Sequence, residues 1–157
     1  MYAAQMSDID QERARLRRLL RSKDPTVLNR RPPNGDWSII ENVRHLLFAE
    51  QLHLGGFLPG RVQWSPLGLA NRARREFAAS GSEPTTDIEN VFAAWDKVHA
   101  PIRRAVLSSA GPDLERALWR NHRHLGIHIG VIEKLLRAAE KPPTRRASKM
   151  TQDRGQA

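Results

Sequence analysis

The sequence predicts an all-α protein, a four-helix bundle in the order up-down-down-up. Apolar residues recur every three or four positions in four long segments, which is the period of an α-helix. No segment shows the convincing alternation of apolar and polar residues that indicates a strand. The first and last connections are short, which favours antiparallel neighbours. The long connection between the second and third helices can cross the bundle and leave those two helices parallel.

The first helix is expected over residues 7–23. Ser7 can cap its start, acidic residues follow, and basic residues end the segment, as the helix dipole prefers. Its apolar stripe is thin and consists of Ile9, Leu16, Leu19 and Leu20. We expect its arginine-rich face to be simply solvated. The stretch DPTVLNRRPPNGD that follows is predicted to be a loop, because prolines and a glycine break it.

The second helix is expected to open at Ser38, which forms an S-x-x-E capping box with Glu41. In such a box each side chain accepts a hydrogen bond from the backbone of the other residue. Two adjacent glycines, Gly55 and Gly56, weaken the end of this helix. Residues 58–84 then form the long connection, with a short helix predicted at LANRARREFAA, residues 69–79.

The third helix is expected to begin near Thr86, where TDIE offers a second capping box. Its apolar stripe is Ile88, Val91, Phe92, Trp95, Val98, Ile102 and Ala105. Pro101 should kink this helix, because it lacks an amide hydrogen and clashes with the preceding turn. The last helix is predicted from about Asp113 to Glu140, after the breakers Gly111 and Pro112.

Length and composition indicate one domain over residues 1–140 and a basic, disordered tail over residues 141–157. The chain has 157 residues and a formal net charge of +9, part of which belongs to the tail. It contains no cysteine, which excludes disulfides, thiolate metal sites and a cysteine nucleophile. No signal peptide or membrane-spanning stretch is recognisable, so we expect a cytoplasmic protein with no membrane partner.

Among the six histidines, only His124 and His128 have the i, i+4 spacing on a predicted helix. They lie about 40° apart around the helix axis, in line with the apolar stripe. Two such imidazoles can chelate one divalent metal, although one surface and one core histidine is the more common outcome. The motif lacks the glutamate of H-E-x-x-H and so offers no protease base.

A stable metal site needs a third ligand from another helix. The candidates are His45 within the second helix, His99 near Pro101, and His53 near the end of the second helix. Taken alone, a single histidine in a helix is usually structural, so spacing leaves the choice open. For His53, His99 and His122 we expect structural roles.

Two segments resemble the DinB/YfiT-like family of small metal-binding bundles. GDWSIIENVRHLLFAE, residues 35–50, resembles the family pattern G-W-S-[IL]-x-E-x-x-x-H-L-x-x-x-E. HLGIHIGVI, residues 124–132, resembles the H-x-x-x-H-x-G-Q-[IL] segment of its last helix. The resemblance covers roughly residues 8–140, and the two segments together are far more specific than either alone.

The resemblance implies an up-down-down-up four-helix bundle, often a homodimer. It also implies a divalent metal, zinc or nickel among others, held by His45, His124 and His128. Activities in the wider superfamily include transferases and isomerases in which the metal activates a low-molecular-weight thiol. The expectation is therefore a metal-dependent thiol transferase or isomerase acting on a small-molecule substrate, with no catalytic residue assigned.

The sequence departs from the family pattern at Val131, where many members have glutamine. This change spares the three ligands but puts catalytic activity in more doubt than metal binding. Glu41 and Glu50 match family acids. The capping box accounts for Glu41, and we expect Glu50 to pair with a surface arginine in preference to a ligand imidazole.

Three alternatives stay open at this point. The same metal site could serve a metal-dependent hydrolase, or the bundle could have lost its chemistry and only dimerise. Nucleic-acid binding is less favoured, although the chain is basic. The sequence lacks a helix-turn-helix pattern, an aromatic and basic platform, and a zinc-finger pattern.

Overall fold

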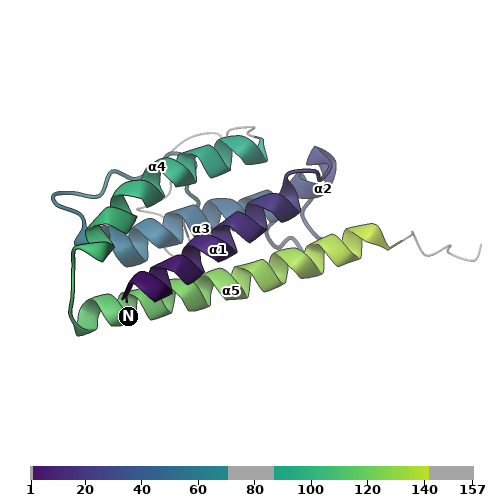
Figure 1. Ribbon diagram of the computed structural model, residues 1–157. Helices are drawn as coiled ribbons and strands as arrows, with labels where there is room; N and C mark the ends of the chain where they lie inside the picture. Colours follow the sequence, from purple (N-terminus) through teal and green to yellow (C-terminus); the bar gives the residue numbers. More distant parts are fainter. Residues whose placement is uncertain (1, 71–86, 142–157) are drawn as a thin grey trace, which may run out of the picture.

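A computed structural model of the chain describes residues 2–70 and 87–141, and all regular secondary structure within these ranges is helical (Figure 1). The elements are α1 (Tyr2–Leu20), α2 (Pro25–Asn29), α3 (Ile39–Leu54), the 3-10 helix η1 (Gly55–Phe57), α4 (Ile88–Leu107) and α5 (Pro112–Glu140). The all-α prediction is therefore confirmed for the described residues. The short helix predicted over 69–79 and the tail 141–157 fall almost wholly outside them.

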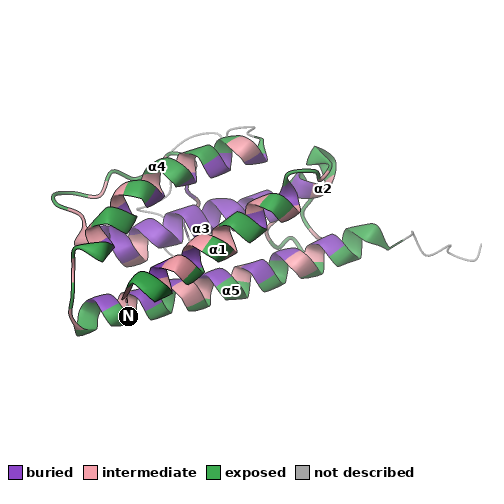
Figure 2. Cartoon of the chain, in the orientation of Figure 1, coloured by how far each residue is buried: buried purple, intermediate pink, exposed green. Residues whose placement is uncertain are grey.

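Helix α3 is the most enclosed element of the fold. It packs against both α4 and α5, and α1 packs against the same two helices (Figure 1). Nearly all residues of α3 are consequently buried, including polar ones (Figure 2). This position places the imidazole of His45 and the carboxylate of Glu50 inside the protein.

The core is formed by apolar side chains from all four long helices. Of the stripe predicted for α4, Val98 and Ala105 are only partly buried, whereas the other members are buried. Trp95 and Phe92 are its largest buried side chains, and their rings stack with centroids 6.1 Å apart. Burying one large apolar side chain contributes about 1.5–3 kcal/mol, so this stripe is a main source of stability.

Helix α1 begins at Tyr2, five residues before the predicted start at Ser7. The hydroxyl of Tyr2 donates a hydrogen bond to the carbonyl of Gly111 at 3.2 Å and accepts one from its amide at 3.1 Å. Met6 is fully buried in the core. Contacts with a distant part of the chain thus stabilise the first turn of α1. The prediction that Ser7 caps the start of this helix was wrong.

The arginine-rich face of α1 is not merely solvated, as predicted, but bridges to α4 and α5. Arg17 pairs with Glu89 at 2.9 Å and with Asp96 at 2.8 Å, both on α4. Arg15 pairs with Glu133 of α5 at 2.8 Å. Because these pairs are partly exposed, each adds roughly 1 kcal/mol at most.

The segment predicted to be a loop before α3 contains the short helix α2. Asp24 caps this helix, because its carboxylate accepts a hydrogen bond from the Thr26 amide at 2.7 Å. Pro25 occupies the first helical position, where its missing amide hydrogen costs nothing. Leu28 is buried against the core, and the burial of its side chain stabilises this short helix.

The two predicted capping boxes differ from the observed caps in detail. The Ser38 hydroxyl accepts a hydrogen bond from the Glu41 amide at 3.2 Å, as predicted. The Glu41 carboxylate instead accepts two hydrogen bonds from Arg31, each 2.8 Å long. At α4 the cap is Asp87 and not Thr86, and its carboxylate accepts bonds from the next backbone amides.

Candidate metal centre

The packing of α3 against α5 brings together His45, His124 and His128. Each offers a ring nitrogen, and these three atoms all lie within 4.8 Å of one another. The ring centroid of His45 is 5.0 Å from that of His124 and 4.9 Å from that of His128. His45 is buried and the other two are half-buried. The three histidines named from the sequence therefore form one cluster that can hold a metal ion.

A backbone carbonyl orients the ring of His45. Nδ1 of this ring lies 2.9 Å from the carbonyl oxygen of Leu69. A carbonyl can only accept, so Nδ1 carries the hydrogen and Nε2 keeps its lone pair. Nε2 lies 3.3 Å from Nε2 of His124 and is thus aimed into the cluster.

Asn42 orients the ring of His128 in the same way. The Asn42 side-chain amide donates to the Ser38 carbonyl at 2.8 Å, which turns its oxygen toward His128. That oxygen lies 2.8 Å from Nδ1 of His128, so Nδ1 donates and Nε2 keeps its lone pair. We did not single out Asn42 from the sequence. Its position three residues before His45, on the same face of α3, was the available signal.

His124 lacks a comparable support. Its Nδ1 atom is buried and has no hydrogen-bond partner among the described residues. Buried polar atoms without partners are rare, and they mark positions where an ion, a water or a ligand can complete the bonding. The nitrogen of His124 that faces the cluster is Nε2, so the missing partner of Nδ1 belongs to the other side of the ring.

Burial keeps all three imidazoles neutral at pH 7. Loss of solvent lowers the pKa of His45 below its ordinary value of 6.5. The same effect, added to repulsion from His128, His45 and His53, lowers the pKa of His124 to about 3. Burial and the proximity of His45 lower the pKa of His128 to about 4. Neutral imidazole is the form that binds a metal ion.

The donor set and its spacing suit a divalent transition metal. Two nitrogens bound to a tetrahedral zinc ion at 2.0–2.1 Å lie about 3.3 Å apart. The separation between Nε2 of His45 and Nε2 of His124 is 3.3 Å. Imidazole nitrogen is a preferred ligand of zinc, nickel, copper and iron, so the residues present fit such an ion.

Aromatic side chains surround the cluster. The ring centroid of Trp37 lies 4.8 Å from that of His45 and 6.5 Å from that of His128. The ring of Phe48 lies 6.1 Å from His45. These apolar groups limit water around the imidazoles, which strengthens electrostatic interactions at the site.

His53 lies beside the cluster, although we expected only a structural role for it. Its ring meets the ring of His124 edge-on, with centroids 5.4 Å apart, and its Nδ1 lies 3.2 Å from the Asn121 side-chain oxygen. His53 follows His45 by eight residues, a spacing that returns only roughly to the same helix face. Its contact with His124 could therefore not be read from the spacing.

Glu50 and His99 lie together, apart from the cluster. Glu50 is 1 % exposed and lies 4.0 Å from the guanidinium of Arg13 on α1, so the predicted pairing with an arginine is present, but it is buried and not at the surface. Its carboxylate accepts hydrogen bonds from Trp95 Nε1 at 2.7 Å and from His99 Nδ1 at 2.5 Å. Nε2 of His99 faces Asp10 at 2.6 Å. His99 thus has the structural role that we expected and is not the third member of the cluster.

Val131 lies one helical turn beyond His128 and is 40 % exposed. Its side chain has no hydrogen-bonding atom. This position on α5 therefore supplies no polar contact.

The fold and the cluster define an all-helical protein with a three-histidine group able to hold a metal ion. The chain belongs to the DinB superfamily, whose family model matches residues 8–132. The match includes the segments 35–50 and 124–132 that carry the resemblance in the sequence. Neither the curated proteins nor the solved structures gave a match. No helix within the described ranges is long and apolar enough to cross a membrane.

Proposed function

We propose that this member of the DinB superfamily binds a divalent metal ion through His45, His124 and His128, with zinc or nickel as the preferred ions. The observation that carries the proposal is the convergence of three ring nitrogens within 4.8 Å. Two of the rings are held by Leu69 and Asn42. Supports of this kind fix the tautomer of metal-binding histidines in other proteins.

We further propose that the protein is a metal-dependent transferase or isomerase that uses a low-molecular-weight thiol and a small-molecule substrate. A divalent ion with three neutral protein ligands keeps its full charge and an open position, and so lowers the pKa of a bound thiol. The chain has no cysteine, so the nucleophilic sulfur comes from outside the protein. Trp37 and Phe48 limit water at the site.

A non-catalytic metal-binding bundle is the second candidate, and the observation that favours it is Val131. A valine at this position gives a substrate no hydrogen bond from α5 one turn beyond His128. A metal-dependent hydrolase would need the same three histidines, and no contact described above favours it over thiol chemistry.

The proposed assembly is a homodimer of up-down-down-up four-helix bundles. The contacts of α1 and α3 with both α4 and α5 support the bundle. Two apolar side chains on α5, Trp119 at 60 % and Ile127 at 54 % exposed, support a second copy of the chain as partner. Sedimentation of the wild type and of Trp119→Ser/Ile127→Ser measures the oligomeric state. The wild type should be a dimer and the double variant a monomer. A monomeric wild type would contradict the homodimer.

Metal analysis of the purified protein tests the site. Wild type should carry about one equivalent of zinc or nickel, and His124→Ala should carry far less, because one of three ligands is gone. His122→Ala is the matched control, since this residue of α5 lies outside the cluster. A metal-free wild type that cannot be reloaded with zinc or nickel would sink the proposal.

Cobalt substitution tests the thiol part separately. Thiolate bound to cobalt(II) gives a strong near-ultraviolet absorption, whereas cobalt bound only to nitrogen and oxygen does not. We expect this band when a low-molecular-weight thiol is added to cobalt-loaded wild type. If cobalt stays bound and no thiol produces the band, the thiol chemistry is wrong while the metal site stands.

A further inference from the structure

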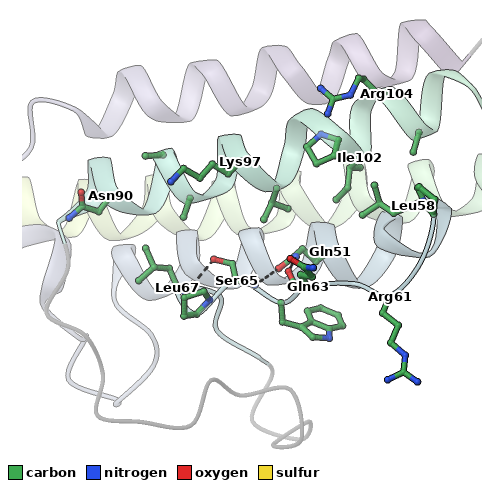
Figure 3. Close-up of a pocket in the computed structure, with 18 of the residues that line it drawn as sticks. Gln51, Leu58, Arg61, Gln63, Ser65, Leu67, Asn90, Lys97, Ile102 and Arg104 are labelled. Atoms are coloured by element: carbon green, nitrogen blue, oxygen red, sulfur yellow. Dashed lines mark hydrogen bonds between the residues drawn. The ribbon is translucent and has the colours of Figure 1, made fainter.

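A cavity lies between α4 and the segment 58–67 (Figure 3). Its volume is about 1030 Å³, and none of the three clustered histidines lines it. Sites for small organic molecules have volumes of roughly 300–1,000 Å³. The cavity is therefore large enough for a ligand of that size.

Most of the cavity lining is apolar. Its walls include Leu58, Trp64, Leu67, Ala94, Val98 and Ile102. Each of these side chains offers carbon surface to a ligand, and burial of apolar surface contributes about 25 cal/mol per Å². The lining thus favours a ligand with an extended apolar body.

Among the residues that the structure describes, the charged side chains that line the cavity are all basic. They are Arg61, Lys97 and Arg104, and no aspartate or glutamate of these ranges lines it. None of the three has a carboxylate partner within the described ranges. Arg17 on α1, by contrast, is paired with two. In Figure 3, Lys97 points along α4 toward Asn90, Arg104 projects from α4 away from Gln51 and Ser65, and Arg61 points outward.

The wall opposite α4 is already fixed. Gln51 of α3 is buried, donates to the Gln63 carbonyl at 2.8 Å and accepts from the Ser65 amide at 3.0 Å (Figure 3). Arg44 donates to the Leu67 carbonyl at 3.0 Å. A wall that is ordered before binding reduces the entropy lost when a ligand enters.

From these observations we propose that the cavity binds an organic anion with an apolar body, such as a medium-chain carboxylate. The apolar body packs between Val98 and the opposite wall. The anionic head lies near Lys97, whose charge has no carboxylate partner among the described residues. This site is separate from the metal centre and does not depend on its chemistry.

Calorimetric titration of the zinc-loaded full chain at low salt tests the proposal, with octanoate, 1-octanol and octylammonium as ligands. These probes share one apolar chain and differ in charge. Octanoate should bind about tenfold tighter than either of the others, and its affinity should fall as salt is added. Equal affinities for the three ligands, or no octanoate binding, would overturn the proposal.

Substitutions locate the binding. Lys97→Gln should weaken octanoate binding about tenfold, because the charge near the head is lost. Lys134→Gln, an exposed lysine on α5, is the matched control and should leave binding unchanged. Ala94→Phe should block the cavity, with helix content measured by circular dichroism to show that the variant folds. Unchanged octanoate affinity in Lys97→Gln would overturn the assignment.

A carboxylate can also bind a metal ion directly, so the metal centre needs its own control. His124→Ala lacks one of the proposed metal ligands and should still bind octanoate. Loss of octanoate binding in His124→Ala would overturn the cavity as the binding place. Failure of metal binding in the wild type would leave the cavity proposal intact, so the two proposals can fail independently.

Discussion

The three imidazoles of the cluster differ in the hydrogen-bond partner of Nδ1, the ring nitrogen that is not offered to a metal ion. A main-chain carbonyl holds His45, a side-chain amide holds His128, and no described residue holds His124. A main-chain support changes little on mutation, whereas the side-chain support can be removed. Asn42 is therefore the position at which ring orientation can be tested without removing a ligand.

Asn42→Ala should weaken zinc binding by about 10- to 100-fold, because His128 loses the acceptor that fixes its tautomer. Competition with a chromophoric chelator measures the affinity. Asn90→Ala on the exposed side of α4 is the matched control. An unchanged zinc affinity in Asn42→Ala would show that the Asn42 contact does not orient a ligand.

The metal-free protein should lose stability as the pH falls below about 6.5. The folded state keeps His124 and His128 neutral down to pKa values of about 3 and about 4. Unfolded histidines take up protons near pH 6.5, so the unfolded state binds more protons between these limits. Stability from these two groups is complete above pH 6.5 and declines toward pH 3.

Urea unfolding of metal-free wild type across this pH range measures the loss. His124→Asn/His128→Asn should show a shallower decline, because the two groups no longer titrate. His122→Gln, outside the cluster, should keep the wild-type slope. Parallel curves for wild type and the double variant would contradict the assignment.

Individual residues were predictable where spacing carried the information. The i, i+4 spacing singled out His124 and His128, but only the resemblance to a family selected His45 over His99. The arginine partner of Glu50 was anticipated, but its burial was missed because a charged residue on a helix is usually exposed. Its burial depends on α3 lying between other helices, which the α3 sequence does not reveal.

Helix α3 carries two unrelated polar systems. Asn42 and His45 face the cluster shared with α5. Farther along the helix, Glu50 joins Trp95 and His99 of α4, and His99 in turn meets Asp10 of α1. The Glu50 system therefore links three helices without touching the candidate metal ligands.

Glu50→Leu should lower the free energy of unfolding by about 3–5 kcal/mol, because it leaves buried groups of Trp95 and His99 without their partner. The metal content should stay at the wild-type level. Glu133→Gln removes a carboxylate from a partly exposed pair and should cost about 1 kcal/mol or less. Urea unfolding of both variants gives the comparison. Equal losses in the free energy of unfolding would show that the buried contacts of Glu50 contribute no more to stability than the exposed pair of Glu133.

Helix interiors were better predicted than helix ends. The stripe of α4 and the extent of α5 followed from apolar spacing, which is a local property of the chain. The start of α1 depends on a bond between Tyr2 and Gly111, more than a hundred residues away. Distant contacts of this kind leave no mark on local sequence pattern, so the first turn was missed.

For the molecule as a whole, the candidate metal centre joins α3 to α5, which are far apart in the sequence. A ligand that binds only the folded state stabilises it by about 2.7 kcal/mol at a hundred times its Kd. Zinc should therefore raise the Tm by several degrees, since about 1 kcal/mol corresponds to roughly 2–4 °C in a chain of this size.

Thermal unfolding monitored by circular dichroism, with zinc and then with excess chelator, tests this expectation. The chelator should reverse the rise, and His128→Ala should show little rise at all. A rise of equal size in wild type and His128→Ala would place the stabilising zinc elsewhere on the protein.

The segment 63–69 contacts both the histidine cluster and the cavity. On one side the Leu69 carbonyl accepts the hydrogen bond from His45. On the other side Trp64 lines the cavity and stacks on Phe48 with ring centroids 5.3 Å apart. A ligand that shifts this segment from either side changes the binding free energy at the other. By thermodynamic linkage, any factor by which zinc changes octanoate affinity is the factor by which octanoate changes zinc affinity.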